Sequence, residues 1–427
     1  MKVWILALLA VPALLAADSQ QLSLSLKAQA DYERVELSAI PPLHDTVGCM
    51  QSQAALLAVA APSEVSTIQY RRGYCALAGA TLSQNAAEFA AAAAAFDKAI
   101  QAWPGRYNEK HQTPEPVSAG LRVLAAVARL EAAGTDDTAS GRARQELSEA
   151  LGSATCLSRL MTEPRCENVI DLGRQWLGAF ALREGNWPAA SQDFAPATAP
   201  AWAEWTSGKQ AFAGGSYSVA AGDFRKAVAV WESRRDMAEL PILERLAPQP
   251  EMASAYADLG GARLLAGDAT GAIASLNLAI KEDPSAARSY YLRARAKEAA
   301  GEKDAALADY NMASRTAFAA AKDLASGEAH LYRGILLYRR KDFTRAEDEF
   351  SSAMNFEIGA GLRADARAWR YMAAVAEGSC QASRELLQQS LAGVTPYFPR
   401  AEAQGVLAGC PALASDAGVH PAGMPRP

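Results

Sequence analysis

A tandem pattern of small and large apolar residues constrains the fold of this chain more than any other sequence feature. In its clearest copy, Gly260 is followed by Gly267, Ala272, Leu276 and Ala279. Four more copies keep the same internal spacings, and they begin at Gly178, Gly208, Ala294 and Gly334. Such self-similarity predicts one supersecondary unit that is repeated along the chain.

Close packing of two antiparallel helices explains this pattern. A small residue in the middle of the first helix, such as Gly260, lets the second helix approach closely. A glycine such as Gly267 then ends the first helix in the left-handed conformation that other residues resist; the last copy has Lys341 there. In the second helix, Ala272, Leu276 and Ala279 lie on one face and fill the seam between the helices.

These residues resemble the tetratricopeptide repeat over about residues 171–358, nearly half of the chain. The resemblance implies an all-α protein in which helix–turn–helix units stack as a right-handed α-solenoid. It also implies that the first helix of each of the five units lines a concave groove, where a partner binds.

Carried over unit by unit, the resemblance assigns a set of side chains to this groove. Aromatic and arginine side chains contribute most to binding per residue, through contact area, stacking and forked hydrogen bonds. The alternative is that several of them, notably Trp205 and Leu331, pack against neighbouring helices. The candidate groove residues are Trp202, Trp205, Lys209, Phe212, Arg288, Tyr291, Arg295, Leu331, Ile335, Tyr338 and Arg339.

Outside the five repeats the pattern weakens, and composition suggests the remaining boundaries. The stretch QLSLSLKAQ, residues 21–29, alternates apolar and polar residues, which favours a strand or an extended leader. Terminal repeats usually diverge to cover the core, so a shortened hairpin is expected after the last copy. The expected segments are an extended leader (18–44), degenerate repeat-like hairpins (45–104), a helical segment with flexible loops (105–170), a divergent C-terminal capping hairpin (359–414) and a disordered tail (415–427).

The first 17 residues have the features of a secretory signal peptide. Lys2 precedes an apolar core over residues 3–15, and Ala16 and Ala17 provide a small-residue end. No cysteine follows the core, so a lipid anchor is not expected, and no later segment is predicted to span a membrane. We therefore expect cleavage after Ala17 and an exported chain, located in a bacterial periplasm rather than secreted.

The six cysteines agree with export to an oxidising compartment. Cys49 and Cys75, and likewise Cys380 and Cys410, lie symmetrically about turn-like stretches, and Cys156 and Cys166 flank a third. Residues equidistant from the turn of a helical hairpin face each other, which favours three disulfides over buried free thiols. Zinc is disfavoured, because there is no CxxC pair and the four histidines are scattered.

Composition and motifs favour recognition over catalysis. The chain is 50% hydrophobic and 21% charged, which is ordinary for a globular protein, and its net charge of −5 gives no electrostatic case for nucleic acid. The sequence lacks GxxxxGK[ST], GxSxG and HExxH, so we expect no catalytic residues, no metal ligands and no cofactor.

These observations predict a non-catalytic, exported scaffold that binds another protein or a peptide in the cell envelope. The alternative is a periplasmic binding component that holds a small molecule or lipid for a transporter. An enzyme would need a helical catalytic domain between residues 105 and 164, where no acid–base pair is evident.

The disulfide pattern is testable directly. Non-reducing peptide mapping of the mature protein should recover Cys49–Cys75, Cys156–Cys166 and Cys380–Cys410, each stabilising by roughly 2–4 kcal/mol because each closes a loop of the unfolded chain. Crossed pairs, or six thiols open to alkylation, would contradict the proposed hairpin geometry.

Overall fold

A computed structural model provides the fold of this chain. It describes residues 20–36, 38, 41–103, 107–108, 113–114, 119–134, 136–152, 163–194, 199–234, 242–320, 326–356 and 358–410. The predicted signal peptide and the predicted tail lie outside these residues, as does Cys156.

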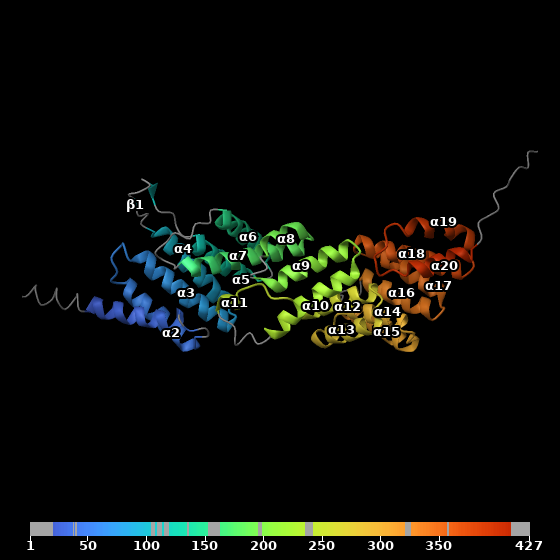
Figure 1. Ribbon diagram of the computed structural model, residues 1–427, viewed down its shortest axis with the longest axis horizontal. Helices are drawn as coiled ribbons and strands as arrows, with labels where there is room; N and C mark the ends of the chain where they lie inside the picture. Colours follow the sequence, from blue (N-terminus) through green and yellow to red (C-terminus); the bar gives the residue numbers. More distant parts are fainter. Residues whose placement is uncertain are drawn as a thin grey trace, which may run out of the picture. The chain divides into compact units, whose positions relative to one another are not determined.

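The described chain is built from α-helices joined by short connections, which confirms the predicted all-α class (Figure 1). Within the described residues, the strands are β1 (Tyr107–Asn108) and β2 (Thr113–Pro114), which pair antiparallel. The helices are residues 20–36 and α2 (Leu43–Leu57), α3 (Val65–Ser83), α4 (Ala86–Gln101), α5 (Ala119–Ala133), α6 (Asp137–Gly152), α7 (Glu163–Arg183), α8 (Trp187–Asp193), α9 (Pro200–Ala213), α10 (Tyr217–Ser233), α11 (Ile242–Arg245), α12 (Met252–Leu265), α13 (Ala269–Glu282), α14 (Ala287–Ala299), α15 (Lys303–Ala320), α16 (Gly327–Arg339), α17 (Phe343–Asn355), α18 (Ala360–Ala376), α19 (Cys380–Ser390) and α20 (Arg400–Ala408).

Local capping explains where several of these helices begin. The side chain of Asn85 accepts a hydrogen bond from the Ala87 N–H at 2.9 Å, and Asp268 accepts one from the Gly271 N–H at 2.8 Å. Ser326 accepts from the Ala329 N–H at 3.2 Å. Each cap satisfies an N–H that has no partner within its own helix, so the first turns of α4, α13 and α16 are fixed by sequence.

The prediction of an extended leader over residues 18–44 is wrong, because residues 20–36 form a helix. Ala28, Tyr32 and Val35 follow the helical spacing and are buried, whereas Leu22 and Leu26 are more than half exposed. The helix is held through the side-chain amide of Gln53 in α2, which donates to the Ala28 carbonyl oxygen at 2.7 Å. Tertiary burial of one face therefore outweighs the local alternation of residues 21–29.

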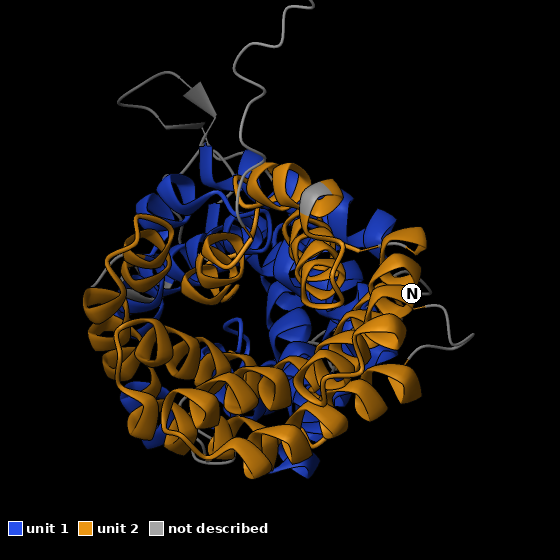
Figure 2. Cartoon of the chain, turned by 90° about the vertical axis from the view of Figure 1, so that its right-hand side faces the viewer, with its two compact units in different colours: residues 1–206, 229–249 blue, residues 207–228, 250–427 orange. Residues whose placement is uncertain are grey.

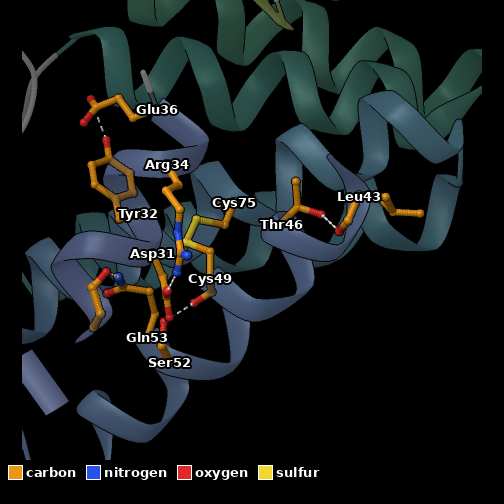
Figure 3. Close-up of a disulfide and its surroundings, with 11 residues drawn as sticks. Asp31, Tyr32, Arg34, Glu36, Leu43, Thr46, Cys49, Ser52, Gln53 and Cys75 are labelled. Carbon is orange, nitrogen blue, oxygen red and sulfur yellow. Dashed lines mark hydrogen bonds and ion pairs between the residues drawn. A yellow bond between two sulfur atoms is a disulfide. The ribbon is translucent and has the colours of Figure 1, made fainter. Parts of the chain in front are cut away.

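Both predicted disulfides that fall within the described residues are present. Cys49 and Cys75 join α2 to α3 with their Cα atoms 6.1 Å apart, beside the helix of residues 20–36 (Figure 3). Cys380, the first residue of α19, is joined to Cys410, which lies two residues beyond the end of α20, with Cα atoms 5.6 Å apart. The hairpin-symmetry argument for these two pairs is confirmed.

The close approach predicted for the repeated unit is seen in each of the four repeats whose first helix carries a glycine at this position. A Cβ added to Gly208 in α9 would lie 2.6 Å from the Phe224 ring in α10, far inside van der Waals contact. The same holds for Gly260 against Leu276 and for Gly334 against Phe350, each at 2.6 Å. In these repeats a glycine is therefore required where the large residue of the second helix crosses the first, whereas the remaining repeat has Ala294 there.

The remaining repeat positions also behave as predicted. Ala272, Leu276 and Ala279 in α13 are fully buried, as are the corresponding residues of α10 and α17. Gly267 has a φ of 88°, and Lys341 has a φ of 63°, so the substituted residue adopts the same left-handed turn. Lys341 does so at some conformational cost, because a Cβ disfavours this region.

The α3–α4 hairpin makes the same contact with a different spacing. A Cβ on Gly73 would lie 2.7 Å from the Phe96 ring, and Ala92 and Ala99 are fully buried on either side of Phe96. Gly73 and Phe96 are 23 residues apart, against 16 for Gly208 and Phe224. Both helices are longer between this contact and the turn than α9 and α10 are, so this hairpin shares the packing of the repeats without their sequence register.

Contacts divide the chain into two compact units, coloured in Figure 2. Unit 1 comprises residues 1–206 and 229–249, and unit 2 comprises residues 207–228 and 250–427. In unit 2, Trp369 of α18 is fully buried between Phe350 of α17 and Phe398, which precedes α20. The segments after the last repeat thus complete the core of this unit.

The glycine contact gives a matched pair of substitutions. Gly208→Ala should lower the free energy of unfolding by roughly 1–3 kcal/mol, because its Cβ would overlap the Phe224 ring. Gly222→Ala should raise it by about 0.5–1 kcal/mol, because nothing lies within 4 Å of that Cβ and alanine favours the helix. Urea denaturation of both variants checks this, and shifts of the same sign would contradict the packing described.

Candidate functional site

The predicted groove residues do not form one exposed surface. Trp202 and Trp205 belong to unit 1, and the other nine belong to unit 2.

Trp202 and Trp205 lie in an aromatic cluster of unit 1. Trp202 stacks on Phe194, with ring centroids 5.3 Å apart, and both tryptophans contact Trp231. The Trp202 indole N–H donates to the Pro248 carbonyl oxygen at 3.2 Å, and Trp205 is only 7% exposed. The packing alternative therefore describes this pair better than an exposed position in a groove.

The apolar candidates of unit 2 are also packed. Leu331 and Ile335 are almost fully buried in α16, and Tyr291 stacks on Tyr332 with ring centroids 5.0 Å apart. Tyr338 lies against Trp369 at 5.0 Å. These residues hold neighbouring hairpins together.

The charged candidates meet acidic residues of the same unit. Asp258, buried in α12, accepts from Lys209 of α9 and from the Arg288 Nη2 of α14, the latter at 3.1 Å. Desolvation lowers the pKa of Arg288, but the negative charge of Asp258 and other nearby groups raise it by a larger amount. The net effect is a raised pKa, so the guanidinium stays charged. The Arg288 side chain is 48% exposed, so it keeps a solvent-facing donor surface while it neutralises Asp258.

Arg295 on α14 and Arg339 on α16 share one acidic residue, Glu298. Glu298 of α14 lies 3.4 Å from the Arg295 Nε and 2.6 Å from the Arg339 Nε. Arg339 also pairs with Glu402 of α20, between Nη1 and Oε1 at 2.6 Å. Two arginines thus face two glutamates at this place, and their charges balance.

A segment that the groove prediction did not include lies against Arg295 of α14 and Gly261 of α12. It runs from Val394 to Glu402 and is called the 394–402 segment below. Arg295 donates through Nη1 to the Tyr397 carbonyl oxygen. The Tyr397 ring lies 6.0 Å from the Phe212 ring, and a Cβ on Gly261 would overlap its hydroxyl oxygen. Burial raises the pKa of Tyr397 to about 12.

Asp365 of α18 holds the start of this segment. Its carboxylate accepts from the Thr395 N–H at 2.7 Å and from the Thr395 hydroxyl at 2.6 Å. Asp365 is 2% exposed, and this burial raises its pKa to about 6, although the Thr395 hydrogen bonds and the Arg295 and Arg400 charges lower it. The carboxyl therefore titrates in the mildly acidic range.

The sequence offered a weak signal for this segment. Pro396 and Pro399 enclose two aromatic residues in a stretch without helical periodicity, inside the loop that Cys380 and Cys410 close. Sequence reasoning placed the stretch in a turn between two helices, which is correct. The residues of α12, α14 and α16 that it contacts could not be predicted, because these contacts join distant parts of the chain.

A second cationic feature lies between α15 and α16. A cavity of about 370 Å³ is lined there by arginine, polar and apolar side chains, and Leu336 forms part of its floor. The lining residues are Asn311, Ser314, Arg315, Phe318, Arg333, Leu336, Leu337 and Arg340. None of them was a candidate groove residue.

Two general properties concern only the residues that the structure describes. No helix among them combines the length and apolar content needed to cross a membrane. In the same residues, no three histidine, cysteine or acidic side chains come close enough together to hold a metal ion.

Comparisons with known proteins give likenesses of arrangement only. No family model matches the chain, and no curated protein matches it by sequence. Among solved structures, yeast Tom70 is 13% identical with a TM-score of 0.33, covering 86% of each chain. A tetratricopeptide repeat protein from Parabacteroides merdae is 13% identical with a TM-score of 0.25, covering 86% of this chain and 99% of its own. The Cut9–Hcn1 hetero-tetramer of APC/C is 12% identical with a TM-score of 0.25, covering 92% and 87%. The likeness to tetratricopeptide repeats therefore rests on the hairpin contacts themselves.

The buried carboxyl of Asp365 predicts a pH dependence. Its pKa in the folded protein, about 6, lies above its ordinary value of 3.8, so its contribution to stability is complete below about pH 4 and is lost as pH rises through 6. The unfolding free energy of wild type minus that of Asp365→Asn should therefore fall between pH 4 and pH 7, by at most about 3 kcal/mol. Urea denaturation of both proteins across this range measures the difference, and a constant or rising difference would contradict the assignment.

Proposed function

We propose that this chain is a non-catalytic, exported scaffold that binds a protein or peptide partner at a surface of unit 2. This surface, called the arginine surface below, is formed by Arg288, Arg295 and Arg339 on α14 and α16. The observation that carries the proposal is that an irregular stretch of the chain itself, in the 394–402 segment, already lies against these residues. A surface that holds one irregular stretch through its backbone and side chains has the chemistry to hold another.

Three kinds of contact support this reading. Arg295 binds a backbone carbonyl oxygen, which any peptide offers. Gly261 leaves space for an aromatic ring, and Arg339 binds a carboxylate. Arg288 adds a guanidinium that is half exposed beside the ring. Arginine and aromatic contacts of this kind dominate the energetics of many protein interfaces.

Export and a periplasmic location are part of the proposal. The signal-like first 17 residues support it, as do the two disulfides, because disulfides persist in oxidising compartments and are rare in the cytosol. Osmotic-shock fractionation of cells that make the full chain, with N-terminal sequencing, tests this part. A cytosolic protein that retains residues 1–17 would refute it.

Affinity capture with the mature chain as bait tests the partner-binding role. Arg288→Ala should lose a protein that wild type retains, because the exposed guanidinium would contact it, while Arg225→Ala, at an exposed position on α10, should retain it. Titration of the purified partner should then show at least a tenfold weaker affinity for Arg288→Ala and weaker binding at higher salt. Equal affinity of the two variants, with equal melting temperatures, would remove the arginine surface from the proposal.

A further inference from the structure

We propose that Tyr397 and Glu402 are resident occupants of the arginine surface, and that the partner replaces them with a segment of the same chemistry. That segment would carry an aromatic side chain and, about five residues further on, a carboxylate, as the resident one does. This inference rests on the proposed function and adds to it both the chemistry of the partner and a competitor within the chain.

Tyr397 and Phe398 are neighbours in sequence but have different surroundings. Phe398 is 3% exposed and packs against Trp369, with ring centroids 5.5 Å apart, so it belongs to the core of unit 2. Tyr397 is only half buried and contacts residues of the first helices instead. Removing the Tyr397 ring from its place therefore leaves the core contact of Phe398 intact.

The place that Tyr397 occupies is shaped by an adjacent pair of glycines. Gly260 is needed for the contact with Leu276 inside its own hairpin. Gly261 has no such role, and its missing side chain leaves the space that the Tyr397 hydroxyl fills. The Phe212 ring lies on one side, and Arg288 is among the charged groups that act on the hydroxyl. An aromatic side chain with a polar tip fits these surroundings.

The charges around Arg339 favour a carboxylate at the position that Glu402 occupies. With Glu402 present, Arg295 and Arg339 carry two positive charges against the two negative charges of Glu298 and Glu402. The Glu402 side chain is 35% exposed, and if it turns into solvent Arg339 loses one of the two carboxylates with which it pairs. Because the Arg339 side chain is only 16% exposed, the loss of this carboxylate partner is costly, so an incoming carboxylate would be bound in its place.

The rest of the segment is held independently of these two side chains. Thr395 is bound to Asp365, Phe398 is in the core, and the disulfide between Cys380 and Cys410 closes the loop that contains them. Exchange therefore requires two side chains to leave, not the segment. Because the resident groups are tethered, they compete at a high effective concentration, and only a partner that supplies both groups would displace them.

The test uses a fluorescein-labelled peptide with the sequence of residues 393–403, GVTPYFPRAEA, and the full mature chain. The variant Tyr397→Ala/Glu402→Gln removes the ring from one position and the negative charge from the other, and it keeps all three arginines of the arginine surface. Fluorescence anisotropy should show at least tenfold tighter binding of the peptide to this variant than to wild type. A peptide with alanine in place of its tyrosine should lose at least tenfold in affinity.

A matched pair of further substitutions identifies the surface. Adding Arg339→Ala to the double variant should weaken peptide binding at least tenfold, because the peptide carboxylate loses its partner. Adding Arg225→Ala, on an exposed face of α10, should leave the affinity unchanged. Equal effects of the two arginine changes would overturn the proposal, since the peptide would then bind by charge alone.

The double variant is compared with wild type only if it keeps the helicity, the melting transition and both disulfides. If it does not, Tyr397→Phe/Glu402→Gln retains the ring and should bind the peptide more tightly than wild type, by about threefold or more. No gain in affinity for whichever variant is folded would overturn the proposal. The assay contains no natural partner, so the two proposals can fail separately: a captured partner without any gain in peptide affinity would overturn this inference and leave the proposed function standing.

Discussion

The close contact between a glycine in one helix and a large apolar side chain in the next is the interaction on which this structure depends. Gly208 and Phe224 show it in unit 2, and Gly73 and Phe96 show it in unit 1. Without a Cβ, the first helix lets the ring lie against its backbone, and the flanking alanines of the second helix close the remaining space. This contact therefore brings the two helices of a hairpin close together at the point where they cross.

That packing also explains why the charged residues of the first helices are so extensively paired. Neighbouring first helices bring Lys209, Asp258 and Arg288 together across α9, α12 and α14. A buried carboxylate such as Asp258 is tolerated only with cations beside it. Arg288 meets this need and still reaches solvent, so one side chain supports both the fold and the proposed binding of a partner.

Much of the fold could be predicted from the sequence because its determinants are local or periodic. The repeat spacing, the left-handed turn at Lys341 and the two disulfides all follow from residues within one hairpin. The helix of residues 20–36 could not be predicted in this way, because its buried face is set by contact with α2. The candidate groove residues were predicted from residue type and repeat position. These do not show which side chains are exposed: Tyr291 is buried, whereas Arg288 is half exposed.

The sequence by itself therefore determined the repeated unit, its helical class and the residues that its hairpins bury. The tertiary structure decided what lies against the first helices, above all that Tyr397 and Glu402 meet Gly261 and Arg339. Residues 261 and 397 are far apart in the chain, and no periodic pattern links them. Their contact arises because the capping segments, held by Asp365 and by the disulfide between Cys380 and Cys410, return to the surface that the repeats have already formed.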